Sequence, residues 1–293
     1  MSALQAEPLA GYDERSTSDL SAWCARLAVY PILNVARPWH EVEAWGAALL
    51  GAGARVLQVR DKSASGSALV RACRRLRPMA ERAGAWLIVN DRLDIAWDFA
   101  DGVHLGQKDG GVASARWRAR SRPRIENQTQ ETVGLRPFLV GASVQTPDEA
   151  RRAWADGADY LSASPVFGTP TKANAGSGIG LAGVSRLRAA LPGVPLVAIG
   201  GMRGQRIAAV VAAGADGVAY VAAPGAPSVA DARSWVALGR QARVAGDLGG
   251  DPSAPAALLT DEVTASVVAG SAAERRDSRA TPATLRPGAG GRA

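Results

Sequence analysis

Hydroxyl and ammonium donors crowd the stretch SPVFGTPTK, which spans residues 164–172. Thr169 and Thr171 offer hydroxyl groups, and Lys172 is one of only three lysines in a chain whose other basic residues are arginines. The stretch continues into ANAGSGIG, where small residues let backbone N–H groups approach a ligand closely. A solvated polar turn is the alternative, but this combination of donors suits an anion such as a phosphate.

A second group of donors lies in QVRDK, where Gln58, Arg60 and Lys62 alternate along the chain. In an extended strand residues two apart project to the same side, so these three side chains face one way. Arginine offers a planar fork and lysine a point charge, and both suit a polyanion. A hydrated strand end is the alternative, but the amide of Gln58 within an otherwise apolar run favours a functional role.

Carboxylates follow two further apolar runs. Asn90 ends WLIVN and Asp91 follows it directly, and Asp109 comes shortly after GVHLG. Mg²⁺ takes one or two carboxylates together with waters and substrate phosphate oxygens, so Asp91 and Asp109 could share one ion. Asn90 and Asp91 could instead cap the following helix. His104 lies inside the second run, either as a substrate contact or as a hydrogen-bonded core residue. Neither histidine stands in a nucleophile–base motif, which argues against a serine hydrolase.

These residues lie in or just after short apolar runs, which alternate along the chain with longer Ala/Arg-rich segments. The runs are fully apolar, as is typical of parallel strands covered on both faces. The predicted strands are 27–35, 55–60, 86–90, 102–106, 138–143, 160–164, 195–200 and 217–221. The predicted helices are 40–52, 66–83, 91–99, 111–119, 147–156, 180–191, 204–213 and 227–243. Eight such units in about 220 residues predict a (β/α)8 TIM barrel. A doubly wound sheet needs fewer strands, and no GxGxxG follows the first one.

In a barrel of this kind the chemistry lies at the carboxyl ends of the strands. Ser143 ends the fifth predicted strand, and Gly200 and Gly201 end the seventh. A helix N-terminus after AYVAAPG, together with these glycines, is the usual phosphate cradle of the fold. The sequence therefore predicts two anion sites, one from the second and sixth loops and one from the seventh and eighth.

The ends of the chain differ from the barrel in composition. Residues 1–20 are polar and irregular, and we expect them to be flexible. The barrel domain then spans 21–245. Residues 246–293 are rich in Gly, Pro, Ala, Ser and Arg without a sustained apolar period, which predicts a low-complexity, disordered tail with one short helix near 256–268.

Bulk composition narrows the class of protein. Hydrophobic residues make up 47% of the 293, enough for a large core. The net charge of +7 could suggest nucleic acid, but the arginines of 116–124 have no aromatic interleaving beyond Trp117 and indicate a solvated segment. Neither cysteine lies in a CxxC motif, and the N-terminus has no signal-peptide pattern, so we expect a reducing cytoplasm. We expect phosphorylated small molecules as partners, with no nucleic acid and no membrane, and leave a homo-oligomer open.

Six motifs, taken in order, carry a resemblance to a known family. QVRDK, VNDRLDIAWDFADGVHLGQKD, GASVQTPDEA, ADYLSASPVFGTPTK, VAIGG and AGADGV, over about 27–225, resemble the thiamine-phosphate synthase (thiamine-phosphate pyrophosphorylase) family. The resemblance implies a transferase of thiamine biosynthesis that joins a hydroxymethylpyrimidine pyrophosphate to a thiazole phosphate. It further implies that Mg²⁺ assists a dissociative loss of pyrophosphate. Thiazole tautomerases share the fold and several of the motifs.

The resemblance also assigns roles to the predicted site residues. The pyrimidine pyrophosphate would be held by Gln58, Arg60, Lys62, Asn90 and His104, and Mg²⁺ by Asp91 and Asp109. The departing pyrophosphate or the thiazole phosphate would be bound by Ser143, Thr169, Thr171 and Lys172. Gly201 and the amides near Val221 and Ala222 would take the thiazole phosphate. Charge on the leaving group would be stabilised by Arg60, Lys62, Lys172 and Ser143, which are the expected catalytic residues.

The sequence departs from the family pattern at several positions. The usual His of GxSxH, which is the acid/base of the tautomerases, is Gln145. A usual Gly-Pro is Ser164-Pro165, a usual Ser is Ala222, and the first strand ends in Asn34 rather than Thr-Asp. An insertion of about 116–136 precedes the fifth strand. A tautomerase-like isomerase and a non-catalytic binder of thiamine precursors are the alternatives. Gln145 argues against the first, and the retained Asp and Lys residues argue against the second.

Overall fold

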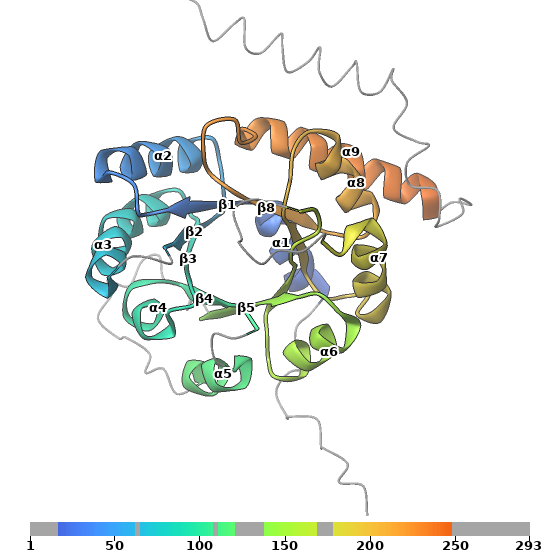
Figure 1. Cartoon of the computed structure of the whole chain (residues 1–293), viewed down its shortest axis with the longest axis horizontal. Helices are drawn as coiled ribbons and strands as arrows, with labels where there is room; N and C mark the ends of the chain where they lie inside the picture. The colour runs from blue at the N-terminus through green and yellow to red at the C-terminus, as the bar shows by residue number, and fades with distance from the viewer. Residues whose placement is uncertain (1–16, 62–64, 108–110, 121–137, 169–177, 248–293) are drawn as a thin grey trace, which may run out of the picture. The chain divides into compact units, whose positions relative to one another are not determined.

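The computed structural model describes residues 17–61, 65–107, 111–120, 138–168 and 178–247. Within these ranges eight parallel strands pair in chain order, and β8 pairs with β1 to close a barrel (Figure 1). The strands are β1 (Val29–Asn34), β2 (Val56–Arg60), β3 (Trp86–Asn90), β4 (Gly102–Leu105), β5 (Leu139–Val144), β6 (Tyr160–Ala163), β7 (Leu196–Ile199) and β8 (Gly217–Val221). The predicted TIM barrel is confirmed, with every strand within one or two residues of its expected bounds.

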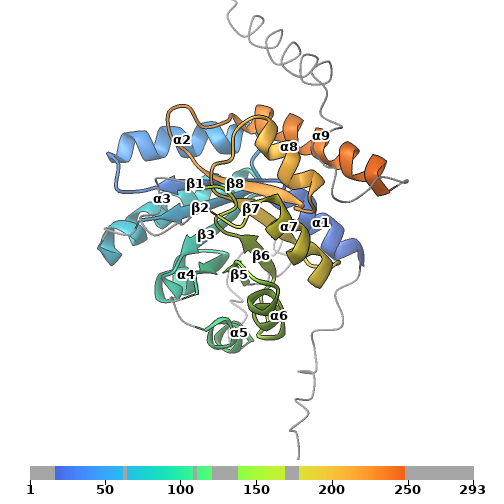
Figure 2. The ribbon, with the colours of Figure 1, turned by 45° about the vertical axis from the view of Figure 1, so that its right-hand side comes forward.

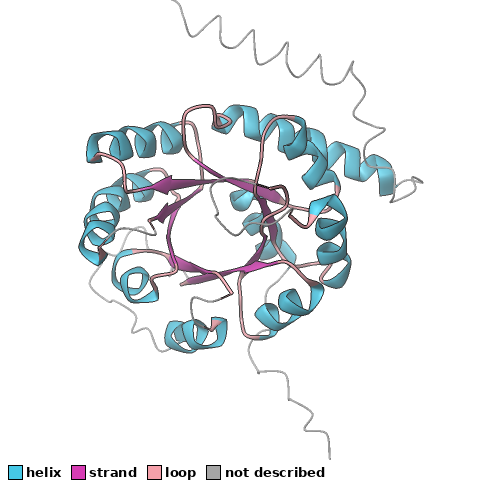
Figure 3. Cartoon of the chain, viewed as in Figure 1, coloured by secondary structure: helices cyan, strands magenta, loops and turns pink. Residues whose placement is uncertain are grey.

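A helix follows each strand, and the helices form a ring outside the strands (Figures 1 and 3). They are α2 (Trp39–Gly51), α3 (Gly66–Arg82), α4 (Leu93–Phe99), α5 (Val112–Arg120), α6 (Pro147–Ala155), α7 (Gly180–Ala190), α8 (Gln205–Ala212) and α9 (Val229–Asp247). In the turned view the helices again lie outside the strands (Figure 2). None of the helices described is both long and apolar enough to cross a membrane.

One helix was not predicted. Helix α1 (Thr17–Leu27) precedes the barrel and takes in residues 17–20, which we expected to be flexible. Its Trp23 ring lies 5.1 Å from that of Trp86, and Arg26 donates to the carbonyl of Gly84 at 2.8 Å. Trp86 begins β3, so α1 packs against the amino-terminal end of the barrel. The predicted tail, the 256–268 helix and most of the 116–136 insertion lie outside the described residues, and those predictions stand untested.

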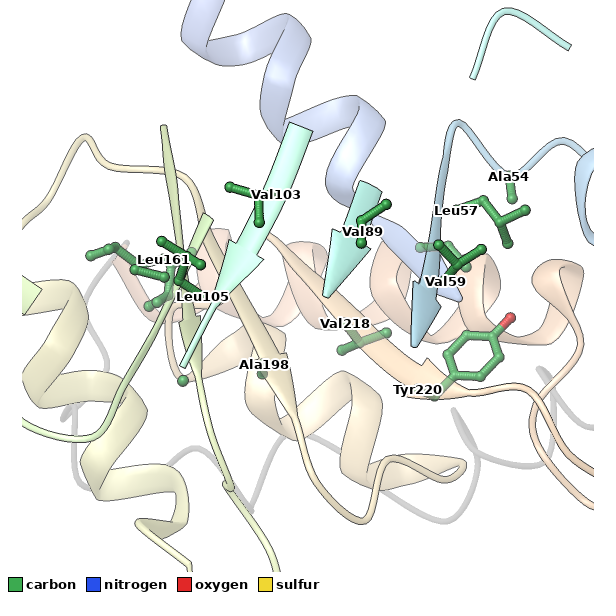
Figure 4. Packing of buried hydrophobic residues seen from close by; sticks show 14 of the residues in the cluster. Ala54, Leu57, Val59, Val89, Val103, Leu105, Leu161, Ala198, Val218 and Tyr220 are labelled. Atoms are coloured by element: carbon green, nitrogen blue, oxygen red, sulfur yellow. The ribbon is translucent and has the colours of Figure 1, made fainter. Parts of the chain in front are cut away.

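The core has two layers because most of the strands carry apolar residues on both faces. An inner cluster fills the barrel and contains Leu27, Tyr30, Ile32, Val56, Trp86, Ile88, Leu139, Tyr160, Val197 and Ala219. A larger outer cluster lies between the strands and the helices, and Figure 4 shows part of it, including Leu57 and Val59 of β2. Burial on both faces explains why the strand sequences lack alternation.

A repeated carboxylate clamp fastens the amino-terminal end of the barrel. The residue just before β4, β6 and β8 is an aspartate in each case. Its carboxylate accepts a hydrogen bond from a backbone N–H of the preceding strand, which is β3, β5 or β7. It also pairs with an arginine of the helix that comes just before this preceding strand. The three sets are Asp101 with Leu87 and Arg77, Asp159 with Val140 and Arg116, and Asp216 with Leu196 and Arg188. The clamp gives a physical reason for the GAD sequences that precede β6 and β8.

Candidate active site

A cavity of about 350 Å³ lies at the carboxyl ends of the strands. Residues from all around the barrel line this cavity. The structure brings eight of the predicted site residues together there. These are Gln58, Arg60, Asn90, Asp91, His104, Ser143, Gly201 and Val221. Five others, Lys62, Asp109, Thr169, Thr171 and Lys172, lie outside the described residues. Residues far apart in the sequence therefore line one cavity, as expected for a barrel whose functional residues lie at the carboxyl ends of its strands.

Strand register fixes the depth of each side chain in the cavity. Arg60, the last residue of β2, pairs with Asn34 of β1, and Asn90, the last residue of β3, pairs with His104 of β4. Gln58 lies two residues deeper on β2, level with Ile88 of β3. The amide of Gln58 is therefore nearer the floor of the barrel, and the guanidinium of Arg60 is nearer its mouth.

A continuous chain of hydrogen bonds crosses the floor of the cavity. Gln58 Nε2 donates to the Tyr30 hydroxyl at 2.8 Å, and the Tyr30 and Tyr160 hydroxyl oxygens are 2.9 Å apart. The Tyr160 hydroxyl lies 3.1 Å from His104 Nδ1, and His104 Nε2 lies 3.0 Å from Ser143 Oγ. His104 is thus both a buried, hydrogen-bonded residue and part of the cavity wall. The sequence did not single out Tyr30 or Tyr160.

The backbone of Asp91 is unusual among the residues that the structure describes. Asp91 is the one non-glycine residue there with a positive φ, 63°, and its N–H donates to the His104 carbonyl at 2.8 Å. Aspartate tolerates this conformation better than most residues, and such positions concentrate at functional sites. Neither Asn90 nor Asp91 is the N-cap residue of α4, because that position is Arg92, whose own side chain makes no capping hydrogen bond.

The residues after β7 provide the tight turn expected of an anion cradle. Gly200 and Gly201 have φ values of 107° and 67°. A Cβ on Gly200 would lie 2.9 Å from the carbonyl oxygen of Phe167, so a larger residue would not fit without a shift. Arg203 follows these glycines and also lines the cavity, which adds a cation that the strand-end rule missed.

The turn after β8 requires a correction. We expected the backbone amides near Val221 and Ala222 to bind a phosphate, but the amide of Ala222 itself donates to the Ile32 carbonyl at 2.8 Å. Ala222 is buried in the outer cluster, while the cavity wall continues through Val221 and then Ala223 to Pro227. The Ala222 amide therefore holds β8 to β1, and any amides that bind a ligand must come from neighbouring residues.

The described part of the cavity offers few carboxylate ligands for a metal. No group of three or more His, Cys, Asp or Glu side chains suited to a metal occurs in the described ranges. Asp91 is the carboxylate that lines the cavity there, and Asp109 lies outside those ranges. A Mg²⁺ ion that takes most of its oxygens from substrate and water needs only one or two carboxylates, so the cavity fits that kind of ion.

The fold and the site together define a class of protein. A closed parallel barrel with guanidinium, imidazole, hydroxyl and glycine groups around one cavity at the carboxyl ends of its strands is typical of (β/α)8 enzymes that bind phosphorylated small molecules. A family model described as thiamine monophosphate synthase matches residues 29–125 and 126–223. The chain belongs to the thiamine monophosphate synthase family, which confirms the resemblance seen in the sequence.

Individual relatives agree with this assignment. The chain is 43% identical to the thiamine-phosphate synthase of Methanoregula boonei, over 58% of this chain and 72% of that one. It is also 43% identical to the thiamine-phosphate synthase of Moorella thermoacetica, over 62% and 80% of the two chains. A solved structure of thiamine phosphate pyrophosphorylase from Pyrococcus furiosus superposes with a TM-score of 0.60 at 29% identity, and covers 75% of this chain and 98% of that one.

Proposed function

We propose that this protein condenses 4-amino-2-methyl-5-hydroxymethylpyrimidine pyrophosphate with 4-methyl-5-(2-phosphoethyl)thiazole to give thiamine phosphate and pyrophosphate. The bond between the pyrimidine methylene carbon and the pyrophosphate oxygen breaks, and its electron pair leaves with that oxygen. The thiazole nitrogen then forms a C–N bond to the methylene carbon. The observation that carries the proposal is that eight residues assigned to this reaction by family resemblance surround one cavity.

The main task of the chain in such a reaction is to stabilise charge on the departing pyrophosphate. Arg60 at the mouth of the cavity would supply one cation for this purpose, and family resemblance assigns Lys62 and Lys172, which lie outside the described residues, to the same task. Ser143 adds a hydroxyl at the end of β5. Gln58, Asn90 and His104 line the same cavity and would bind the pyrimidine. A dissociative step needs no general base to begin, so the 3.0 Å contact between His104 Nε2 and Ser143 Oγ is not required to activate a nucleophile.

The second substrate would occupy the side of the cavity formed after β7 and β8. Gly201 and Val221 line that side, and Arg203 offers a guanidinium for the phosphate of the thiazole. If the thiazole nitrogen is held in line with the methylene carbon, positioning alone supplies a large part of the rate enhancement.

Asp91 and Asp109 would hold Mg²⁺ against the pyrophosphate. When bound, the ion would neutralise the charge that develops on the leaving group. A tautomerase-like isomerisation is less well supported, because that chemistry needs a titratable acid/base where this chain has Gln145. Phosphorylated small molecules as partners follow from the same proposal.

The test uses the full-length purified protein with both substrates and Mg²⁺, and follows thiamine phosphate and pyrophosphate separately. We expect the two products in equal amounts, with neither formed when the thiazole is omitted. A folded protein that makes no thiamine phosphate would refute the proposed function. EDTA should abolish turnover and Mg²⁺ should restore it; turnover that persists in EDTA would refute the metal assignment alone.

A further inference from the structure

The hydrogen-bond chain on the cavity floor has a direction, because its first member can only donate. The Gln58 Nε2 group carries two hydrogens and no acceptor site, so the Tyr30 oxygen accepts at that contact. A phenol has one hydrogen, and the other oxygen contact of the Tyr30 hydroxyl is with Tyr160. The hydrogen of Tyr30 therefore points to Tyr160.

The hydrogen bonds of Tyr160 and His104 run in the same direction. Tyr160 accepts from Tyr30 and gives its single hydrogen to His104 Nδ1. A neutral imidazole that accepts at Nδ1 carries its hydrogen on Nε2, and His104 Nε2 is 3.0 Å from Ser143 Oγ. Ser143 Oγ then accepts from His104, which leaves the serine's own hydrogen free to point into the cavity that Ser143 lines.

We propose that Tyr30 and Tyr160 are positioning residues that hold His104 as the Nε2–H tautomer and so turn the Ser143 hydroxyl into a hydrogen-bond donor toward the anionic substrate. This proposal deepens the proposed function and rests on it for the identity of the anion. If the hydrogen bonds ran from Ser143 toward Gln58 instead, Ser143 would give its hydrogen to His104. It would then present only lone pairs to the cavity, and these would repel a pyrophosphate oxygen.

The fold holds the two tyrosines in a way that suits this role. Both are buried, and burial raises the pKa of Tyr30 and of Tyr160 well above the ordinary range, so each keeps the hydrogen that it must donate. The Tyr30 and Tyr160 rings meet edge to face with centroids 5.9 Å apart, and the His104 ring stacks on Tyr160 at 5.6 Å. A Cβ on Gly141 would overlap the Tyr160 ring, so the glycine makes room for it.

The tautomer can be read directly by NMR, because the chain has only two histidines. His40 is exposed on α2, and His104 is buried. Long-range ¹H–¹⁵N spectra of the free, histidine-labelled protein, at a pH where both rings are neutral, should show an acceptor-type nitrogen at Nδ1 of His104 and a protonated one at Nε2. A His104 ring protonated at Nδ1 would overturn the proposal.

Variants test the part played by the tyrosines. Tyr160→Phe removes the donor to Nδ1 and should shift His104 toward a mixture of tautomers. Tyr30→Phe should do so to a smaller degree, and it serves as the second variant if Tyr160→Phe fails to fold. Tyr220→Phe is the matched control, because Tyr220 is also a buried strand tyrosine but its hydroxyl has no hydrogen-bond partner in the described structure. Unchanged His104 shifts in both Tyr160→Phe and Tyr30→Phe would overturn the proposal.

Kinetics connect the tautomer to the substrate. Tyr160→Phe should lower kcat/KM for the pyrimidine pyrophosphate about tenfold, as expected for one lost hydrogen bond to a charged group. The effect should not add to that of Ser143→Ala, because both changes remove the same donor. Full additivity would overturn the link between Tyr160 and Ser143. If the free protein shows the expected shifts but forms no thiamine phosphate, the proposed function fails while the tautomer assignment stands.

Discussion

The side-chain amide of Gln145 donates a hydrogen bond of 3.1 Å to the backbone carbonyl of Ser164 and so joins the ends of β5 and β6. An amide does not titrate, and this one is engaged with the backbone at an exposed position. We therefore expect Gln145→Ala to lower kcat of the condensation by no more than about fivefold, the effect of one ordinary hydrogen bond. Ser143→Ala is the comparison and should cost more. Equal losses in the two variants would give Gln145 a chemical role.

Arg60 and Arg55 flank the same strand and allow a matched comparison. Arg60 ends β2 and lines the cavity, whereas Arg55 precedes β2 at the other end of the barrel and donates to the carbonyl of Ala83. Arg60→Ala should lower kcat about 10²- to 10³-fold, because it removes a preorganised charge that, in the proposed reaction, would face the leaving group. Arg60→Lys should recover only part of this, since lysine lacks the guanidinium fork. The measurement is the steady-state kcat of each variant. If Arg55→Ala lowered kcat as much as Arg60→Ala, the assignment of Arg60 to the leaving group would be contradicted.

Arg203 should contribute to binding rather than to the bond-breaking step. It lies on the side of the cavity assigned to the thiazole phosphate, and its side chain is exposed. Arg203→Ala should raise KM for the thiazole phosphate about tenfold with kcat little changed, and the difference should shrink as salt is added. Arg186→Ala, on the exposed surface of α7, is the control. A loss confined to kcat would place Arg203 in a different role.

The strands were predictable because burial on both faces leaves a mark in the local sequence of each strand. Each strand of this barrel is covered by the inner cluster on one face and the outer cluster on the other, so an apolar run marks it wherever it occurs. Helix α1 was missed because its segment continues a polar N-terminus, and its packing of Trp23 on Trp86 depends on residues more than sixty positions away. Only the closed barrel makes that contact available.

The site was predictable where it follows from strand ends and not where it depends on contacts across the barrel. Arg60 and Asn90 end their strands and Ser143 is the residue before the end of β5, so the rule for parallel barrels located them. Tyr30 and Tyr160 lie inside apolar strands and look like ordinary core residues, because a sequence does not show that their hydroxyls meet. The error at Ala222 has the same origin: its amide is used by Ile32 of β1, a partner set by the closure of the barrel.

Asp216 should affect stability and leave the chemistry intact, because it lies at the amino-terminal end of β8. Its carboxylate accepts from Arg188 at 2.6 Å and from the Leu196 N–H at 2.9 Å, and the two side chains of the ion pair are only 14% and 19% exposed. Asp216→Ala leaves both donors without this partner and should lower the free energy of unfolding by about 3–5 kcal/mol. Asp216→Asn keeps an acceptor for the Leu196 N–H and should cost less.

The control for Asp216 is an exposed ion pair of similar geometry. Asp148 pairs with Arg151 at 2.8 Å, but the side chains are 84% and 57% exposed. Asp148→Ala should therefore change the free energy of unfolding by about 1 kcal/mol or less. Urea denaturation followed by circular dichroism gives both values, and kcat measured below the unfolding transition should be near that of the unaltered protein for each variant. If Asp216→Ala were no less stable than Asp148→Ala, the clamp before β8 would not hold the barrel together; a selective loss of kcat would instead tie this end of the barrel to the chemistry at the other.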